Sequence, residues 1–175
     1  HLGAQISIPY SYMTPEAFLN NNTKGTMNIL EAAKLNNVKK VIITSTSEVY
    51  GSAIYTPMDE NHSLNAQSPY SASKIAADKF AEAFALSFNV PVIIARPFNN
   101  FGPRQSTRAI IPTIIRQLLS GTKINLGNLN SSRDFVYVED TANAMISLSN
   151  SKFKNAEVFN ICSGKSIKII ELVKN

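Results

Sequence analysis

A tyrosine and a lysine stand four residues apart in the segment Ser68-Pro69-Tyr70-Ser71-Ala72-Ser73-Lys74. Pro69 favours the first turn of a helix and Ser68 is a good N-cap, so the sequence predicts a helix that begins here. Side chains at this spacing lie on one face of a helix, which brings the Tyr70 phenol close to the Lys74 ammonium. A free tyrosine has a pKa of about 10, and a nearby cation lowers that value. Such a pair could take the proton from a substrate hydroxyl. The alternative is a surface pair on an amphipathic helix.

Two apolar runs flank this helix, and each leads into polar residues. The first comprises residues 41–43 and continues through hydroxyl side chains to Glu48, and the second comprises residues 92–95 and continues as a polar loop. Continuous apolar runs are typical of buried parallel strands, and ligands bind beyond the carboxyl ends of such strands. We therefore expect both strand ends and the Tyr70 helix to surround one pocket. Alternate residues of a strand face the same side, so Thr46 and Glu48 are expected to point together toward that pocket.

The rest of the pattern predicts an α/β fold in which helices and strands alternate. Thr14 and Pro15 mark the start of a helix that runs to about Asn36, and the tyrosine-bearing helix continues with an apolar stripe. The stripe comprises Ile75, Ala76, Lys79, Phe80, Ala83 and Phe84. Further elements are a helix over 110–119, a short strand over 124–126, a strand over 133–138, a helix over 140–149 and a strand over 158–162. We expect His62 to lie in a solvated loop.

Composition and charge limit the class of protein. Apolar residues make up 44% and charged residues 17% of the 175 residues, as in an ordinary globular domain. The net charge of +5 suits an anionic ligand, whereas the lysines are scattered and no nucleic-acid-binding signature is present. No apolar run approaches the ~20 residues of a membrane span and no signal peptide is visible, so neither a membrane nor nucleic acid is an expected partner. The single cysteine, Cys162, excludes an internal disulfide, fits a cytoplasmic protein and is expected to be a small core residue.

Taken together, the polar motifs resemble the extended short-chain dehydrogenase/reductase superfamily, the nucleotide-sugar epimerases and dehydratases. The resemblance rests on the strand end over 44–51, the Tyr70-x-x-x-Lys74 pair, and the runs over 96–104 and 133–140. These segments occur in the family's order and extend over nearly the whole chain. The chain is most similar to NAD-dependent 4,6-dehydratases of nucleotide-linked N-acetylhexosamines, such as those that begin legionaminic acid synthesis. The resemblance implies a Rossmann-like, doubly wound parallel sheet with a small substrate-binding lobe.

The resemblance implies roles for the catalytic residues. Tyr70 takes the proton from the sugar 4-hydroxyl, Lys74 lowers the pKa of Tyr70 and holds the nicotinamide ribose, and Thr46 bonds the same hydroxyl. Glu48 removes the C5 proton beside the 4-keto group, so that the C6 hydroxyl leaves as water; a salt-bridged strand-end acid is the alternative for Glu48. Ser47 stands where glucose-type dehydratases have an acid and mannose-type dehydratases have serine, which leaves open the acid that protonates the leaving hydroxyl.

The resemblance also implies the residues that bind ligands, with NAD as the cofactor and no metal. The residues expected to contact NAD are Leu2, Gly3, Ala4, Asn22, Thr44, Tyr70, Lys74 and Pro97. The residues expected to contact the nucleotide sugar are Thr46, Ser47, Asn99, Arg104 and Arg133. Arg133 matches a bidentate phosphate ligand, a role that suits the planar guanidinium. A polar helix face is the alternative for Asn22, and a surface arginine is the alternative for Arg104.

The resemblance divides the chain into two parts. Residues 1–103 are expected to form the C-terminal part of an NAD-binding Rossmann domain, and residues 104–175 mainly an incomplete substrate-binding lobe interleaved with the last Rossmann elements. No glycine-rich pyrophosphate turn occurs, so the chain is expected to be a fragment of a longer protein, with a genuinely short protein as the alternative. In the full-length form, the helix after Pro15 and the tyrosine-bearing helix are expected to form the interface of a homodimer.

The sequence therefore predicts an NAD-dependent nucleotide-sugar 4,6-dehydratase that acts on GDP- or UDP-N-acetylglucosamine. A UDP-glucuronate decarboxylase or a nucleotide-sugar 4-epimerase remains open, since decarboxylases also have a Thr-Ser-Glu-Val-Tyr-Gly motif. A non-catalytic cofactor-sensing or scaffold protein is a third interpretation. The intact set of Thr46, Tyr70 and Lys74 argues against it, because a sensor needs no proton-transfer pair.

Overall fold

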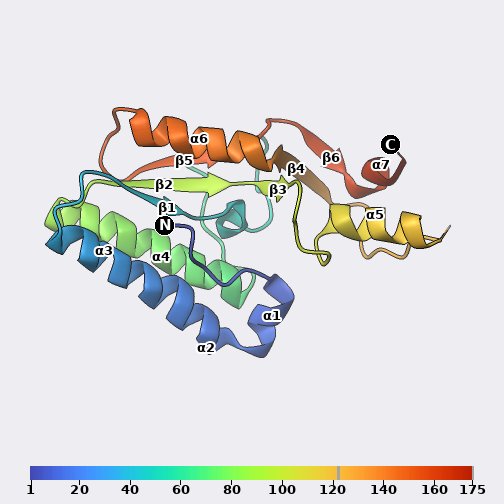
Figure 1. Cartoon of the computed structure of the whole chain (residues 1–175), viewed down its shortest axis with the longest axis horizontal. Helices are drawn as coiled ribbons and strands as arrows, with labels where there is room; N and C mark the ends of the chain where they lie inside the picture. The colour runs from blue at the N-terminus through green and yellow to red at the C-terminus, as the bar shows by residue number, and fades with distance from the viewer. Residues whose placement is uncertain (122, 175) are drawn as a thin grey trace.

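The computed structural model describes residues 1–121 and 123–174 as two small sheets with flanking helices (Figure 1). The helices are α1 (Ile8–Met13), α2 (Pro15–Phe18), α3 (Gly25–Leu35), α4 (Pro69–Phe88), α5 (Ile110–Ser120), α6 (Val138–Asn150) and α7 (Ile169–Lys174). The strands are β1 (Val41–Thr44), β2 (Val92–Pro97), β3 (Asn99–Phe101), β4 (Ser132–Tyr137), β5 (Glu157–Ile161) and β6 (Ser166–Lys168). A π-helical segment (Leu19–Lys24) joins α2 to α3, and a 3-10 turn (Ser47–Tyr50) follows β1. Within the described ranges, no helix is long and apolar enough to cross a membrane.

The larger sheet has three parallel strands in the order β1-β2-β5. The edge formed by β1 is bonded to the first residue of the chain. The His1 ammonium donates to the Ile42 carbonyl (2.7 Å), and the His1 carbonyl accepts from the Thr44 amide (3.2 Å). Helices α3 and α4 cover one face of this sheet and α6 covers the other, so the predicted doubly wound, Rossmann-like arrangement is confirmed (Figure 1). The carboxyl ends of its strands all point toward the second sheet (Figure 1).

Burial of both faces explains the apolar runs in the sequence. Val41 and Ile43 pack toward α3 and α4 against Leu30 and Phe84, whereas Ile42 between them packs toward α6. This is the alternation that a strand imposes on successive side chains. Strand β2 lies in the centre and is buried at every position. Each large aliphatic side chain that is fully buried contributes roughly 1.5–3 kcal/mol.

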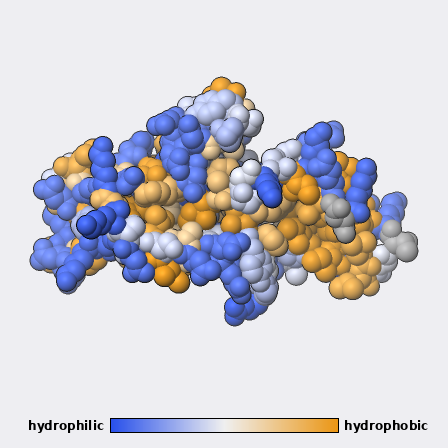
Figure 2. Space-filling view, turned by 90° about the horizontal axis from the view of Figure 1, so that it is seen from above, coloured by the Kyte–Doolittle hydropathy of each residue, from blue (hydrophilic) through white to orange (hydrophobic). Residues whose placement is uncertain are grey.

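The second sheet begins where the chain leaves the first. The backbone continues from β2 through Phe98 into β3, which pairs in parallel with β4, and β6 pairs antiparallel on the other side of β4. Helix α5 lies beside this sheet with Ile115, Leu118 and Leu119 all more than half exposed. Figure 2 shows apolar side chains gathered at this end of the molecule. Strand β5 lies after residue 104 and yet belongs to the larger sheet, so elements of the two expected parts interleave.

The predicted start of α4 is confirmed, but its predicted stripe only partly matches its buried face: Phe84 is buried, whereas Lys79, Phe80 and Ala83 are exposed. Phe80, which belongs to that stripe, is 39% exposed. The buried face comprises Tyr70, Ser71, Ser73, Lys74, Ala77, Asp78, Ala81, Phe84 and Ala85. The first half of this face is polar and the second half is largely alanine, so apolar periodicity alone indicates it only in part.

Other boundaries differ in detail from the prediction. Thr14 precedes α2 but does not cap it, because its hydroxyl donates instead to the Tyr10 carbonyl (3.4 Å). The predicted strand over 124–126 is absent from the described residues 123–130. There the Gln117 side chain replaces a strand partner, since its amide exchanges two hydrogen bonds with the Asn125 backbone at 2.6 and 3.0 Å. Helix α1 was not predicted, and α6 begins two residues before the predicted position 140.

Candidate active site

A reciprocal capping box fixes the start of α4. The Ser68 hydroxyl accepts from the Ser71 amide, and the Ser71 hydroxyl accepts from the Ser68 amide, both at 3.0 Å. Pro69 occupies the first turn, where its missing N–H costs nothing. A cap of this kind contributes roughly 0.5–2 kcal/mol and sets the direction in which the helix begins. Tyr70 lies in this first turn, so its position is determined by local sequence.

Tyr70 and Lys74 lie on the same buried face of α4. Their residues are 9% and 3% exposed, and the Lys74 ammonium donates to the Thr44 carbonyl at the end of β1 (2.6 Å). Burial raises the pKa of Tyr70, and a hydrogen bond with the Thr46 hydroxyl opposes that rise. Desolvation disfavours the phenolate more than its surroundings favour it, so the lowering of this pKa by Lys74 stays a prediction. Burial likewise lowers the pKa of Lys74, and the Asp78 carboxylate opposes that change.

Thr46 and Glu48 reach the site by a different route from the one predicted. Strand β1 ends at Thr44, and Thr46 is the N-cap of the 3-10 turn, where its hydroxyl accepts from the Glu48 amide (3.2 Å). The two residues are therefore not alternate positions of a strand. They nevertheless converge on Tyr70, because the Thr46 hydroxyl bonds the phenol and the Glu48 carboxylate raises its pKa further.

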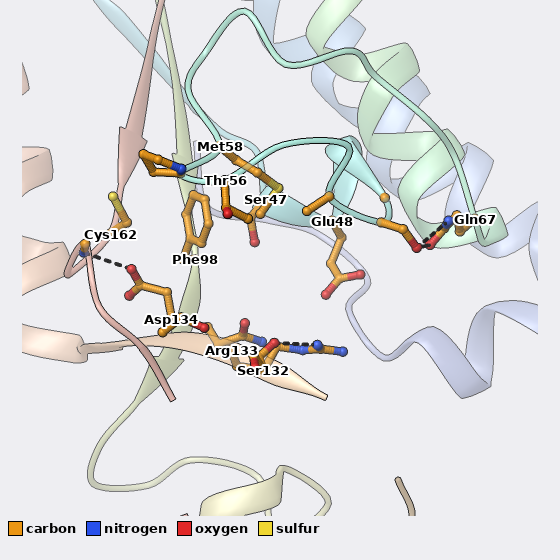
Figure 3. Close-up of a pocket in the computed structure, with 17 residues that line it drawn as sticks. Ser47, Glu48, Thr56, Met58, Gln67, Phe98, Ser132, Arg133, Asp134 and Cys162 are labelled. Carbon is orange, nitrogen blue, oxygen red and sulfur yellow. Dashed lines mark hydrogen bonds between the residues drawn. The ribbon is translucent and has the colours of Figure 1, made fainter. Parts of the chain in front are cut away.

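A cleft of about 360 Å³ opens beside Glu48 between the turn after β1 and the second sheet. One wall consists of Ser47, Glu48, Gly51, Ser52, Ala53, Thr56, Pro57, Met58 and Gln67. The other wall consists of Phe98, Asn99, Ser132, Arg133, Asp134, Cys162, Gly164 and Ser166. Figure 3 shows Glu48 reaching into the cleft from one wall and Arg133 lying on the other. The cleft thus combines a carboxylate beside the buried phenol with a cation opposite it.

Three of the predicted substrate residues that lie beyond the Tyr70 site line this cleft. Ser47 belongs to the wall after β1, Asn99 to β3 and Arg133 to β4. The exposed Arg133 donates from one guanidinium nitrogen to the Ser132 carbonyl (2.8 Å), which leaves donors for an anion. Arg104 does not lie in the cleft wall; it is exposed in a turn with a backbone φ of 65°. Its alternative interpretation, a surface arginine, matches this position better.

The residues expected to contact the cofactor lie near the end of β1. Leu2, Gly3 and Ala4 are exposed, whereas Asn22 is fully buried and bonds both the amide (2.7 Å) and the carbonyl (3.0 Å) of Gln5. Asn22 therefore holds Gln5 at the end of the segment 2–5, and contact of Leu2, Gly3 and Ala4 with the cofactor stays a prediction.

Lys74 supplies the donors that a cofactor needs in this region. Among the described residues, Thr44 supplies the hydrogen-bond acceptor of the Lys74 ammonium, so two of its three N–H groups remain for ligand hydroxyls. Thr44 and the buried Pro97 end the adjacent strands β1 and β2. Donors, exposed backbone and strand ends together fit the ribose of a nicotinamide nucleotide.

Several residues of the site were missed or misjudged. His62 is buried rather than solvated: its Nε2 accepts from the Ile54 amide (3.0 Å), which makes Nδ1 the donor to the Ser63 carbonyl (3.0 Å). Cys162 is exposed in the cleft wall and is not a core residue. Asp134 was not singled out, although it directly follows Arg133 and accepts hydrogen bonds from the backbone amides of Ser163 and Gly164. The position of Asp134 next to Arg133, a candidate phosphate ligand, is the sequence feature that could have indicated it.

The chain is similar to known proteins both in sequence and in structure. A family model described as GDP-mannose 4,6 dehydratase matches residues 1–175. A dTDP-D-glucose 4,6-dehydratase of Dictyostelium discoideum is 34% identical over 99% of this chain and 43% of its own length. A solved UDP-N-acetylglucosamine 4-epimerase from Methanobrevibacter ruminantium M1, in complex with UDP-N-acetylmuramic acid, superposes with a TM-score of 0.93 at 36% identity, over 99% of this chain and 57% of that one. The dTDP-glucose 4,6-dehydratase DesIV from Streptomyces venezuelae, solved with NAD bound, superposes with a TM-score of 0.92 at 31% identity, over 99% and 54%. The chain thus spans about half the length of the relatives it matches.

Proposed function

The chain belongs to the GDP-mannose 4,6 dehydratase family of the extended short-chain dehydrogenases/reductases, and from this membership we propose that the whole protein is an NAD-dependent nucleotide-sugar 4,6-dehydratase. The observation that supports this activity most is the position of Glu48. Its carboxylate lines the cleft and is close enough to Tyr70 to raise the pKa of the phenol. A dehydratase needs two bases over adjacent sugar carbons, and Tyr70 and Glu48 supply them.

In the proposed mechanism Tyr70 removes the proton of the sugar 4-hydroxyl while Thr46 bonds the same oxygen. NAD, when bound, is the hydride acceptor at C4 and the hydride donor at C6. The 4-keto group makes the C5 proton acidic; Glu48 removes that proton while the C6 hydroxyl takes up a proton and departs as water, and Glu48 returns a proton to C5 when C6 is reduced. Because burial raises the pKa of Tyr70, proton removal should become faster as the pH rises toward that pKa.

The remaining residues hold the two ligands. Lys74, the segment 2–4, Thr44 and Pro97 would hold the nicotinamide ribose at the end of β1, where the Lys74 ammonium has donors to spare. Asn99 and Arg133 would bind the diphosphate from the wall opposite Glu48, where a guanidinium can engage two phosphate oxygens.

A nucleotide-linked N-acetylglucosamine is the proposed substrate. Likeness to an epimerase of UDP-N-acetylglucosamine supports this choice. We propose that residues 1–103 together with β5 belong to the cofactor-binding part, and that most of the chain after residue 103 belongs to the substrate lobe. A homodimer through α3 and α4 is supported by the exposed apolar side chains Leu35, Phe80, Leu86 and Phe88 on those helices.

The experiment is product analysis with the whole protein, NAD and GDP- or UDP-N-acetylglucosamine in deuterated water. A dehydratase gives a product lighter by one water that carries deuterium at C5. The alternative is a 4-epimerase, which the 36% sequence identity to a solved 4-epimerase also supports. A 4-epimerase gives a product of unchanged composition that is inverted at C4. Carbon dioxide from UDP-glucuronate would instead identify a decarboxylase. Either of these outcomes, without water loss, would refute the proposal.

A further inference from the structure

A buried chain of polar contacts starts one turn after Lys74 and leads away from the site. Arg96 on β2 donates from Nε to Asp78 Oδ2 (3.1 Å), and its Nη2 lies 3.1 Å from the same oxygen. Its third nitrogen, Nη1, donates to the Tyr50 hydroxyl (3.1 Å), and the guanidinium lies 5.0 Å from the centre of the Tyr50 ring. Asp78 and Tyr50 are fully buried and Arg96 is 2% exposed. The proposed catalytic residues use none of these three side chains directly.

The chain continues from Tyr50 to the wall of the cleft. The Tyr50 hydroxyl donates to Asn160 Oδ1 (2.7 Å), and Asn160 Nδ2 donates to the Met58 carbonyl (3.2 Å). The Asn160 amide donates to the Glu60 carboxylate (2.7 Å). Asn160 lies on β5 directly beside Arg96 in the strand register. The two residues that bond the Tyr50 hydroxyl are therefore held by the same pair of hydrogen-bonded strands.

The middle of the loop after β1 depends on Asn160. Near the end of this loop the Asn65 amide donates to the Val49 carbonyl (2.8 Å), and within the loop His62 accepts from the Ile54 amide. For residues 56–60, the hydrogen bonds to the sheet found in the described part of the chain all run to Asn160. Thr56, Pro57 and Met58 line the cleft, so the support of this segment determines the position of a cleft wall.

We propose that Tyr50 and Asn160 are positioning residues that hold the segment 56–60 in place as a wall of the cleft and thereby set the affinity for the nucleotide sugar. The identity of that ligand rests on the proposed function. The physical reason is preorganisation: a wall that is already fixed loses no conformational freedom when the ligand binds. Neither residue touches the reacting atoms in this scheme, so substrate binding should depend on them more than the chemical step does.

Two variants of the whole protein test this proposal. Tyr50→Phe keeps the buried ring and removes the hydroxyl, whereas Asn160→Ala removes both side-chain hydrogen bonds and keeps the amide that bonds Glu60. We expect faster limited proteolysis at Asp59 and Glu60 by an acid-specific endoprotease and a KM for the nucleotide sugar raised roughly tenfold, with kcat and the Kd for NAD nearly unchanged. Tyr10→Phe is the matched control, because it removes one hydroxyl from an exposed tyrosine of α1, outside the loop and the cleft walls.

Each outcome decides the proposal. Wild-type rates of proteolysis at Asp59 and Glu60 in both variants would overturn it, and so would a fall in kcat as large as the rise in KM. An equal effect of Tyr10→Phe would also overturn it, since the segment would then be sensitive to any lost hydroxyl. If the wild-type protein converts no nucleotide sugar, the proposed function fails, and the proteolysis comparison alone decides whether Tyr50 and Asn160 position the loop.

Discussion

Substitution of Arg96 by methionine isolates the buried charge pair beneath the site. In the whole protein, Arg96→Met keeps a long apolar side chain in the centre of β2 and removes the cation that bonds Asp78 at 3.1 Å from two nitrogens. Asp78 is fully buried, so its carboxylate then retains Lys74 as its remaining charge partner. Loss of one partner of a buried pair costs roughly 3–5 kcal/mol, and the presence of Lys74 places the expected loss near 3 kcal/mol.

The loss should depend on pH with a definite sign. Burial raises the pKa of Asp78 and Arg96 opposes that rise, so the variant should have a still higher pKa. A carboxyl whose pKa is higher in the folded state than in the unfolded state favours folding at low pH and disfavours it as the pH rises through the folded-state pKa. The destabilisation should therefore shrink as the pH falls from neutral toward about 4, the ordinary value for aspartate.

Urea titrations of wild type, Arg96→Met and the double variant Asp78→Leu/Arg96→Met measure this effect. The double variant should recover more than half of the lost free energy of unfolding, because apolar residues replace a buried pair at little cost. A loss below about 1 kcal/mol for Arg96→Met, or a loss that does not change between neutral and acidic pH, would refute the reasoning.

Three further predictions concern the whole protein. Tyr70→Phe should slow reduction of NAD by the nucleotide sugar at least ~10²-fold in single-turnover absorbance, and a rate near wild type would mean that another base acts at C4. Glu48→Gln should lower the pKa of Tyr70, because a carboxylate near the phenol opposes its ionisation; a tyrosinate absorbance titration against Tyr70→Phe measures this, and an unchanged value would contradict the contact. Lys40→Met should cost about 1–2 kcal/mol of unfolding free energy in urea, because the Lys40 ammonium donates to three carbonyls around the end of α6; a matched loss from the exposed Lys39→Met would contradict this.

Where local chemistry determines structure, the sequence was sufficient. The start of α4 follows from Ser68 and Pro69, whose capping interactions involve residues within one helical turn. The positions of β1 and β2 were predictable from their continuous apolar runs, because a strand in a sheet covered on both faces has apolar side chains on both of its sides. The approach of Tyr70 and Lys74 to the end of β1 follows in turn, since α4 begins where β1 ends, at one edge of the sheet.

Where burial is polar or contacts are long-range, the sequence was insufficient. The packed face of α4 contains Lys74 and Asp78, and their burial depends on Arg96 and Thr44 from strands that no local pattern connects to the helix. The 3-10 turn that carries Glu48 forms because Thr46 caps it, which a period of two cannot indicate. The burial of His62 depends on the Ile54 amide, which donates to its ring nitrogen, and no local pattern predicts that contact.

The central claim is that Glu48 is the base that removes the C5 proton. The most direct measurement is single-turnover product analysis of Glu48→Gln against wild type, with GDP- or UDP-N-acetylglucosamine and NAD in the whole protein. Glutamine keeps the size and the hydrogen bonding and removes the base, so water loss should fall by ~10²–10⁴-fold while oxidation at C4 proceeds and reduced cofactor accumulates. Water loss by the glutamine variant at the wild-type rate, with deuterium still entering C5, would contradict the claim.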